Sequence, residues 1–261
     1  MLRTANSDLD TIYNYYLDLQ ERFFNPDDKY DSLKNINDDN EQFFYFLIAF
    51  YGKNKFPKVI SDSDWNNVRG IKTYHGFRKP EHGANFLWDT IYHYGQGTLC
   101  LGFFTTTSYE EASDYAYYHS RAYEPLEMKI PLDNIIELDD LNLLCDTLYR
   151  NKKDLSNIKI DDDRKQKFLQ IREFINSKKD NFFKRIIIDN PTSLALLLGY
   201  DTVKMSMCND TYVVVLNRGN IYVQESDVRR FLNSAGGEYK NFTYLIKSRG
   251  GNENDRTWID F

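Results

Sequence analysis

The fold is decided by two short stretches of sequence, Lys72-Thr73-Tyr74-His75-Gly76-Phe77 and Leu101-Gly102-Phe103-Phe104-Thr105-Thr106-Thr107-Ser108. Both are rich in the β-branched and aromatic residues that favour strands. The second stretch runs directly into Tyr109-Glu110-Glu111-Ala112-Ser113-Asp114-Tyr115, where Ser108 and Glu111 have the spacing of a helix-starting capping box. We therefore expect a strand within 68–77, an extended segment at 98–107 and a helix at 109–120.

Helices are predicted on the N-terminal side of this pair. Apolar residues recur at helical spacing over 8–24, which predicts an amphipathic helix. Asp38 and Glu41 form a capping-box-like pair before the apolar segment 42–51, which predicts a second, buried helix. A third helix is expected at 84–94.

The C-terminal side alternates between strand and helix patterns. Strands are expected at 126–131, 135–138, 200–207, 211–217, 220–224 and 242–247. Helices are expected around 141–148 and at 161–179, 192–198 and 227–233. We therefore expect a mixed α+β fold in a single domain, 1–261. Its parts are an N-terminal helical part at 1–67, a β core at 68–138 and 186–247, and a helical insertion at 139–185.

Composition and charge exclude several classes of protein. A formal charge of −6 and a pI near 5.3 argue against a purely electrostatic nucleic-acid binder. Three cysteines without C-x-x-C spacing argue against a disulfide framework and favour a reducing compartment. The sequence shows neither an apolar signal segment nor the ~18 apolar residues of a membrane span. We expect a soluble, cytoplasmic protein with no membrane partner.

A metal site is not expected. The residues that could be considered as zinc ligands are His75, His82, His93 and Cys100. Their spacing fits none of the common zinc-binding arrangements.

The order of these motifs resembles the ADP-ribosyltransferase superfamily. The similarity is to the branch with a His-Tyr-Glu-type pattern, which includes the poly(ADP-ribose) polymerases and the diphtheria-like toxins. It rests on Tyr74-His75-Gly76, on the strand-to-helix segment from Gly102 to Tyr115, and on the late strands after Leu198-Gly199-Tyr200-Asp201. The resemblance covers about 68–224 and implies a split β core of two packed, mostly antiparallel sheets.

The resemblance also implies how NAD is held as co-substrate. His75 would hydrogen-bond the adenosine-side ribose, and the backbone of Gly76 would hold the nicotinamide carboxamide. Tyr115 would stack on the nicotinamide ring. Thr105 and Thr106 would offer hydroxyls, and Phe104 stands where the family usually has a tyrosine.

The last strand departs from the family because it has no glutamate. Aligning this strand on Asn217 puts Tyr212 in the place of the catalytic acid, whereas aligning it on Asn209 puts Asp210 there. Thr211 is a third register. Among them, Asp210 alone carries a carboxylate, which could stabilise an oxocarbenium-like ribose and deprotonate an acceptor.

The resemblance implies a mono-ADP-ribosyltransferase that acts on a macromolecular acceptor, either protein or nucleic acid. A bacterial or phage-related toxin or defence effector would suit such an enzyme, with an antitoxin or inhibitor protein as a further partner. Two alternatives remain open. One is a catalytically inactive module of the same fold that binds NAD or ADP-ribose, and the other is an NAD glycohydrolase.

Overall fold

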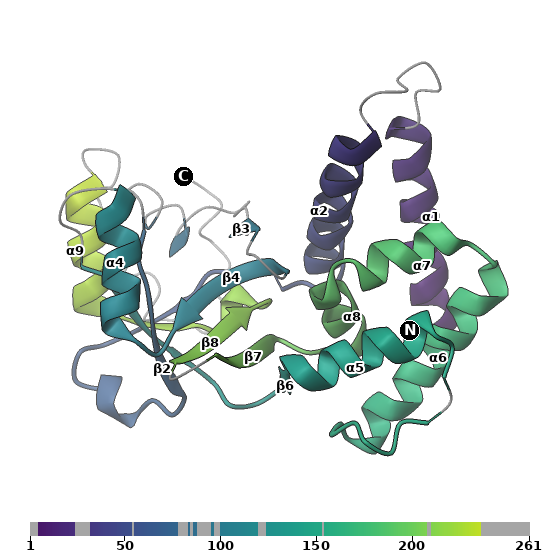
Figure 1. Cartoon of the computed structure of the whole chain (residues 1–261). Helices are drawn as coiled ribbons and strands as arrows, with labels where there is room; N and C mark the ends of the chain where they lie inside the picture. The colour runs from purple at the N-terminus through teal and green to yellow at the C-terminus, as the bar shows by residue number, and fades with distance from the viewer. Residues whose placement is uncertain are drawn as a thin grey trace. The chain divides into compact units, whose positions relative to one another are not determined.

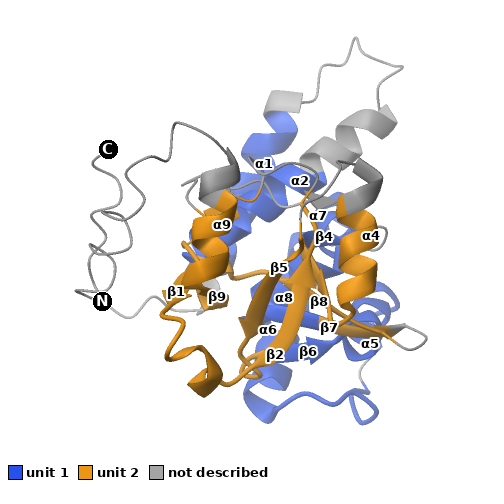
Figure 2. Ribbon diagram, turned by 90° about the vertical axis from the view of Figure 1, so that its left-hand side faces the viewer, with its two compact units in different colours: residues 1–52, 96–102, 135–203 blue, residues 53–95, 103–134, 204–261 orange. Residues whose placement is uncertain are grey.

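The computed structural model describes residues 5–23, 32–53, 55–77, 83, 86–87, 95–96, 100–119, 124–152, 154–207 and 210–235 (Figure 1). The chain divides into two compact units (Figure 2). Unit 1 comprises 1–52, 96–102 and 135–203, and unit 2 comprises 53–95, 103–134 and 204–261. The segment expected to be a helical insertion therefore groups with the N-terminal helices.

The described strands form one nine-stranded sheet in the order β1-β9-β5-β2-β4-β8-β7-β6, with β3 paired to β4 off this path. Their bounds are β1 Lys58–Ile60, β2 Ile71–His75, β3 Gly95–Gln96, β4 Leu101–Thr106, β5 Leu126–Ile130, β6 Ile135–Glu137, β7 Thr202–Met207, β8 Asp210–Val215 and β9 Tyr222–Gln224. The expected mixture of helices and strands is confirmed. The hydrogen bonds, however, join these strands into one sheet rather than two.

The junction of β2 with β4 is narrow compared with those of β2 with β5 and of β4 with β8. These two antiparallel strands pair at one position, Tyr74 with Thr106. The neighbouring junctions are wider, since five residue pairs join β2 to β5 and four join β4 to β8. The candidate residues lie around this narrow junction.

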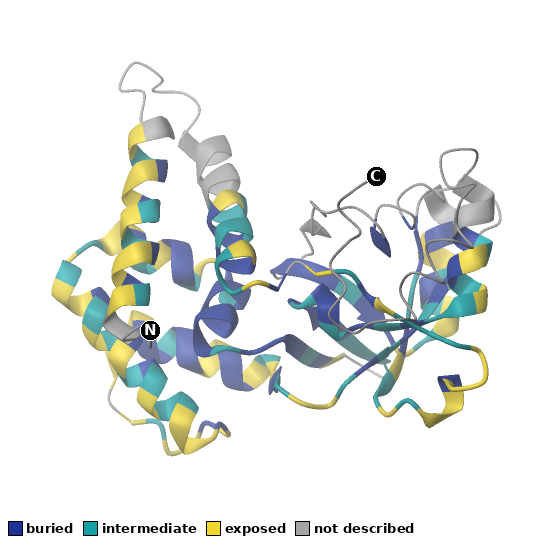
Figure 3. Ribbon diagram, turned by 180° about the vertical axis from the view of Figure 1, so that it is seen from behind, coloured by how far each residue is buried: buried dark blue, intermediate teal, exposed yellow. Residues whose placement is uncertain are grey.

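Unit 1 is mainly helical. Its helices are α1 Ala5–Phe23, α2 Ser32–Phe50, α5 Leu138–Tyr149, α6 Asp162–Lys178, α7 Asn181–Ile188 and α8 Pro191–Leu198. Helix α8 is the core of this unit, because every residue from Thr192 to Leu198 is buried and the helix contacts α2, α5, α6 and α7 (Figure 3). Gly199 ends α8 in the left-handed conformation, with φ of 92°, as glycine allows.

Two sequence predictions in unit 1 were wrong. Helix α2 begins at Ser32, ten positions before the expected start at 42, because the polar segment before the apolar residues is also helical. Residues 186–188 were assigned to the β core but belong to α7. Asp180 caps that helix by accepting hydrogen bonds from the backbone N–H groups of Phe182 and Phe183.

Unit 2 contains β1, β2, most of β4, β5, most of β7, β8, β9 and two described α-helices, α4 Tyr109–His119 and α9 Glu225–Ala235. The predicted helix directly after β4 is confirmed as α4, which packs on β2. The expected strand at 242–247 lies outside the described residues, as does most of the expected helix at 84–94. Within the described part of the chain, no helix is long and apolar enough to cross a membrane.

Candidate functional site

His75 stands at the end of β2 with its ring among aromatic side chains. The imidazole centroid lies 4.4 Å from that of Phe103 and 4.5 Å from that of Phe77. Its Nδ1 lies 2.5 Å from the carbonyl oxygen of Phe104 on β4. A side-chain hydrogen bond therefore adds to the one backbone pair that joins the two strands.

These surroundings keep the imidazole of His75 neutral. Burial lowers its pKa from 6.5 to about 4, and the hydrogen bond to Phe104 opposes this only in part. Because a carbonyl oxygen can only accept a hydrogen bond, Nδ1 must carry the ring proton. The unprotonated Nε2 is then an acceptor, suited to a hydroxyl donor such as a ribose.

Gly76 is required by the packing of β2 against α4. A Cβ at this position would overlap the carbonyl oxygen of Ala112 and would lie 2.9 Å from the nitrogen of Ala116. Glycine at this point therefore has a structural reason that is independent of any ligand. The expected role of its backbone in holding a carboxamide stays a prediction.

Two tyrosines of α4 lie near the end of β2. Tyr115 is 48% exposed, and its ring centroid lies 6.3 Å from that of His75. Tyr109 is 43% exposed and packs edge-on against Tyr74, with centroids 5.3 Å apart. The structure thus brings His75 and Tyr115 near each other and adds a second aromatic pair beside them.

The threonines of β4 use their hydroxyls within the protein. Thr105 is buried, and its Oγ1 donates to the carbonyl of Val213 at 3.0 Å. Thr106 is also buried, and its Oγ1 donates to Oε2 of Glu111 at 3.1 Å. Each hydroxyl therefore donates its one hydrogen bond to an acceptor within the protein. The side chain of Phe104 is partly buried, and its carbonyl is the partner of His75.

Glu111 is the centre of a polar network that joins α4 to the sheet. Its Oε2 accepts the bond from Thr106, and its Oε1 accepts a hydrogen bond from the phenol of Tyr212 on β8. The backbone N–H of Glu111 donates to Oγ of Ser108 at 3.2 Å. The N–H of Ser108 in turn donates to Oγ1 of Thr106 at 3.1 Å. The predicted capping box is therefore completed through Thr106 rather than by Glu111 directly.

The sheet register decides which candidates share a face. Tyr74 pairs with Thr106, and Thr106 pairs with Tyr212, so these three side chains project from the same face. His75 follows Tyr74 by one position, and Thr105 precedes Thr106 by one position. Both side chains therefore project from the opposite face. The expected residues thus leave the strands on both faces, and the ring of Tyr115 on α4 still lies 6.3 Å from that of His75 at the end of β2.

Asp210 is the first residue of β8 and is partly buried. It is two positions from Tyr212, so the two side chains lie on one face, as predicted from the strand period. Thr211, the third register, accepts a hydrogen bond from the backbone N–H of Thr107 through its carbonyl oxygen, and its own N–H donates to Oγ1 of Thr107. Asp210 therefore lies beside the start of α4, near the Glu111 network.

The role of Glu111 beyond capping was missed in the sequence. The spacing from Ser108 to Glu111 indicated a helix start, but it gave no sign of Tyr212, which is 101 residues further along the chain. The sequence pattern that could have identified Glu111 as a candidate is its position one helical turn before Tyr115. Residues at that spacing share one helix face.

No metal centre is found in the part of the chain that the structure describes, since no three His, Cys, Asp or Glu side chains gather there. His82 and His93 lie outside that part. Cys100 is buried in unit 1, and burial raises the pKa of its thiol to about 12.

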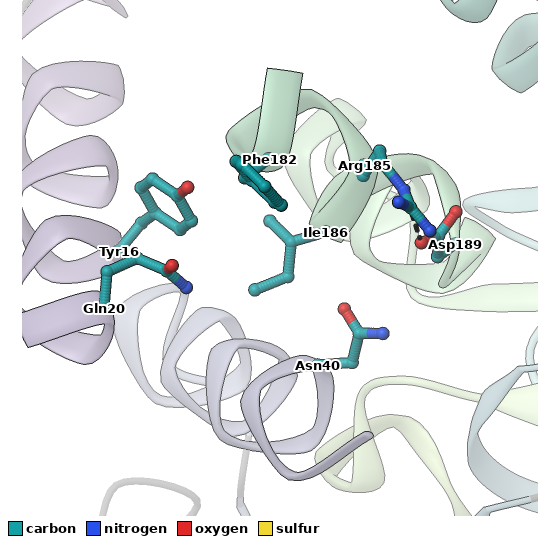
Figure 4. A pocket seen from close by; sticks show the side chains of 7 residues that line it. All are labelled: Tyr16, Gln20, Asn40, Phe182, Arg185, Ile186 and Asp189. Carbon is teal, nitrogen blue, oxygen red and sulfur yellow. Dashed lines mark ion pairs between the residues drawn. The ribbon is translucent and has the colours of Figure 1, made fainter. Parts of the chain in front are cut away.

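A small hollow in unit 1 contains none of the expected site residues. Figure 4 shows its lining side chains, which are Tyr16, Gln20, Asn40, Phe182, Arg185, Ile186 and Asp189. Its volume is about 50 Å³, far below the ~300 Å³ at which small-molecule pockets usually begin. Arg185 and Asp189 pair with each other at 3.5 Å. This hollow is not a candidate for a dinucleotide.

Comparison with known proteins gives no relative: no protein-family model, no curated protein and no solved structure matches the chain.

Proposed function

We propose that unit 2 binds NAD and transfers its ADP-ribose group to a macromolecular acceptor. The observation that carries the proposal is the neutral His75 beside the half-exposed ring of Tyr115, 6.3 Å away. An imidazole acceptor next to an open aromatic ring suits a ligand with a ribose hydroxyl beside a flat heterocycle. The nicotinamide riboside half of NAD has both features, so this proposal places His75 against its ribose rather than against the adenosine-side ribose.

The proposed fold is the split core of the ADP-ribosyltransferases. Its support is the β2–β4 junction, where a single residue pair holds two wider parts of the sheet together. A sheet that curls about such a junction would form the two packed layers of that core. The strand-to-helix connection from β4 into α4 agrees with this interpretation.

The proposed reaction breaks the bond between C1′ of the ribose and the nicotinamide nitrogen. Nicotinamide leaves with the bonding electron pair, and positive charge develops on the ribose as in glycoside hydrolysis. His75 would orient the ribose through Nε2, and Tyr115 would hold the departing ring. A carboxylate near C1′ would stabilise the charge and accept the proton of the acceptor.

The acceptor is proposed to be a protein or a nucleic acid inside the cell, so the enzyme would act in the cytoplasm. A toxin or defence effector, held in check by an inhibitor protein, is the biological setting that the resemblance implies. An NAD glycohydrolase would use the same site with water as the acceptor.

A second candidate is a module that binds NAD or ADP-ribose without turnover. It is favoured by the fact that the hydroxyls of Thr105, Thr106 and Tyr212 all donate to protein acceptors. Such a site would hold a ligand while offering fewer groups to the reaction.

The purified chain incubated with NAD labelled in the adenosine half, with and without cell lysate, tests these alternatives. Transfer predicts released nicotinamide together with labelled macromolecules, which nuclease or protease treatment would identify as nucleic acid or protein. Nicotinamide without labelled product would indicate the glycohydrolase. Saturable NAD binding without released nicotinamide would indicate the binding module. Absence of both binding and release would refute the proposal.

A further inference from the structure

We propose that Glu111 on α4 supplies the carboxylate of the reaction, in place of an acid on β8. This inference rests on the proposed function, because it assigns a role within the same site. It explains how the chain could cleave NAD although its last core strand has no glutamate. In this proposal Asp210 has no role in the reaction, and Tyr212 is a positioning residue that orients the carboxylate of Glu111.

The first support is the way the carboxylate is held. Tyr212 donates to Oε1 of Glu111 and Thr106 donates to Oε2, so each oxygen is fixed by a hydroxyl from a different strand. A carboxylate has about four acceptor positions, and these two bonds occupy two of them. The group is therefore oriented in advance and still able to face a cationic ligand, which is the arrangement that electrostatic catalysis needs.

The second support is its position relative to the ring that is proposed to hold nicotinamide. Glu111 and Tyr115 are four residues apart on α4, so they lie on one helix face with Cβ atoms about 6 Å apart. Between them on the helix, Ala112 packs against Gly76, which brings this part of α4 close to the end of β2. A nicotinamide ring on Tyr115 would place its ribose within a helical turn of the carboxylate.

The third support is the comparison with Asp210. Asp210 lies at the very start of β8, and within the described residues no hydrogen bond to its side chain is found. The carboxylate of Glu111, in contrast, accepts hydrogen bonds from hydroxyls on β4 and β8, which fix its orientation. Glu111 has the better geometry of the two carboxylates on that side of the sheet.

The proposed step is balanced. The bond from C1′ to the nicotinamide nitrogen breaks, and its electron pair leaves with neutral nicotinamide. The oxygen or nitrogen of the acceptor forms the new bond to C1′. The acceptor's proton moves to the carboxylate of Glu111, which later releases it to water.

The test compares three variants whose nicotinamide release and NAD affinity are measured separately. Glu111→Gln keeps the size of the side chain and removes the charge, so release should fall about 100-fold or more, whereas the NAD dissociation constant should change less than about threefold. Tyr212→Phe removes one hydrogen bond of the same network and keeps the charge, so its loss should stay below about tenfold. Among the three variants, Asp210→Asn should show the smallest loss of nicotinamide release.

Chemical rescue separates a lost carboxylate from damaged structure. Glu111→Ala leaves room for a small anion, and sodium formate should restore release at least tenfold in this variant but not in Asp210→Ala. Thermal unfolding of each variant checks that the fold is kept.

The outcomes distinguish failure of this inference from failure of the proposed function. If the wild-type chain releases nicotinamide and Asp210→Asn abolishes release while Glu111→Gln does not, the assignment of Glu111 is wrong and the enzyme remains. The assignment is also wrong if Glu111→Gln loses no more than Tyr212→Phe and formate rescues nothing. If the wild-type chain releases no nicotinamide in any condition, both the function and this inference fall.

Discussion

The polar side chains around the β2–β4 junction mostly satisfy one another. Thr106, Glu111 and Tyr212 form one network, whereas His75 bonds to the carbonyl of Phe104. At the scale of single residues, the structure therefore holds two prepared groups, a neutral imidazole and an oriented carboxylate. Both can be tested without any ligand, through the stability of the chain.

His75 should make the stability of the chain depend on pH. Its pKa is about 4 in the folded chain and near 6.5 when unfolded, so between these values the unfolded chain binds the extra proton. The contribution of His75 is fully present above about pH 6.5 and is lost as the pH falls toward 4. At about 1.4 kcal/mol per pKa unit, it amounts to on the order of 3 kcal/mol.

Urea unfolding of the wild-type chain and of His75→Asn, measured from pH 4 to 7, checks this prediction. The free energy of unfolding should rise with pH more steeply in the wild type than in the variant. Equal slopes would mean that His75 is not held neutral by its surroundings.

Two threonines give a matched pair of opposite predictions. Thr106→Val removes the hydroxyl that links Ser108 to Glu111, so it should destabilise the chain by about 1–3 kcal/mol. Thr73 on β2 is equally buried, but its Oγ1 has no hydrogen-bond partner among the described residues. Thr73→Val should therefore be neutral or stabilising. Denaturant unfolding measures the free energy of unfolding of both variants. A similar loss of stability in both would contradict the hydrogen-bond network around Thr106.

The individual site residues could be predicted only in part. Tyr-His-Gly on β2 pointed to His75, and the helix after β4 pointed to Tyr115, because these are local patterns. The bond from Thr105 to Val213 and the bond from Tyr212 to Glu111 depend on which strand lies beside β4. That pairing brings together residues about one hundred positions apart, and no local pattern in the sequence encodes it.

At the scale of elements, Gly76 allows β2 to approach α4 closely. Gly76→Ala would force a methyl group into the backbone of α4, so the helix must move or the strand must bend. We expect a loss of about 3 kcal/mol in the free energy of unfolding, the upper end of the range for overpacking. Gly52→Ala is a suitable control. It adds a methyl group in open space at φ of 63°, which should cost only about 1–2 kcal/mol.

Thermal and urea unfolding of both glycine variants measure this difference. If Gly76→Ala proves no more destabilising than Gly52→Ala, α4 does not approach β2 as closely as described. Loss of NAD binding in Gly76→Ala at unchanged stability would instead point to a ligand role for this glycine.

Elements with strong local signals were predicted well. Helix α6 has an acidic N-cap at Asp161 and ends at Lys179 in the left-handed conformation, close to the predicted 161–179. Helix α7 was missed because its run Ile186-Ile187-Ile188 has the composition of a strand. The helix is selected by the cap at Asp180 and by the burial of Phe183, Ile186 and Ile187 in the unit 1 core.

At the scale of the whole molecule, unit 1 can be probed by itself through two of its cysteines. Cys100 and Cys145 both lie in unit 1, where burial raises the pKa of each thiol to about 12. Since the thiolate is the reactive form, iodoacetamide should modify them only when unit 1 opens. Pulse labelling across a urea series, read by peptide mass, should give both cysteines one common midpoint. Rapid labelling in native buffer would contradict their burial.

The mixed α+β class of the whole chain could be predicted, whereas its grouping into units could not. Helical periodicity identified 139–185 as different from its surroundings. It could not show that this part gathers with residues 1–52, because that depends on the apolar helix α8 packing against α2.

The parallel pairing of β1 with β9 affects how this protein is made. Residues 58–60 pair with 222–224, so one strand emerges from the ribosome long before its partner. During synthesis β1 must wait, with its backbone groups bonded to water, until nearly the whole chain has been translated. Closing so long a loop is slow, and neither unit is one continuous segment of the chain. The pairing of β1 with β9 is therefore expected to form only after translation. A chaperone that shields exposed strands would have its greatest effect at that stage.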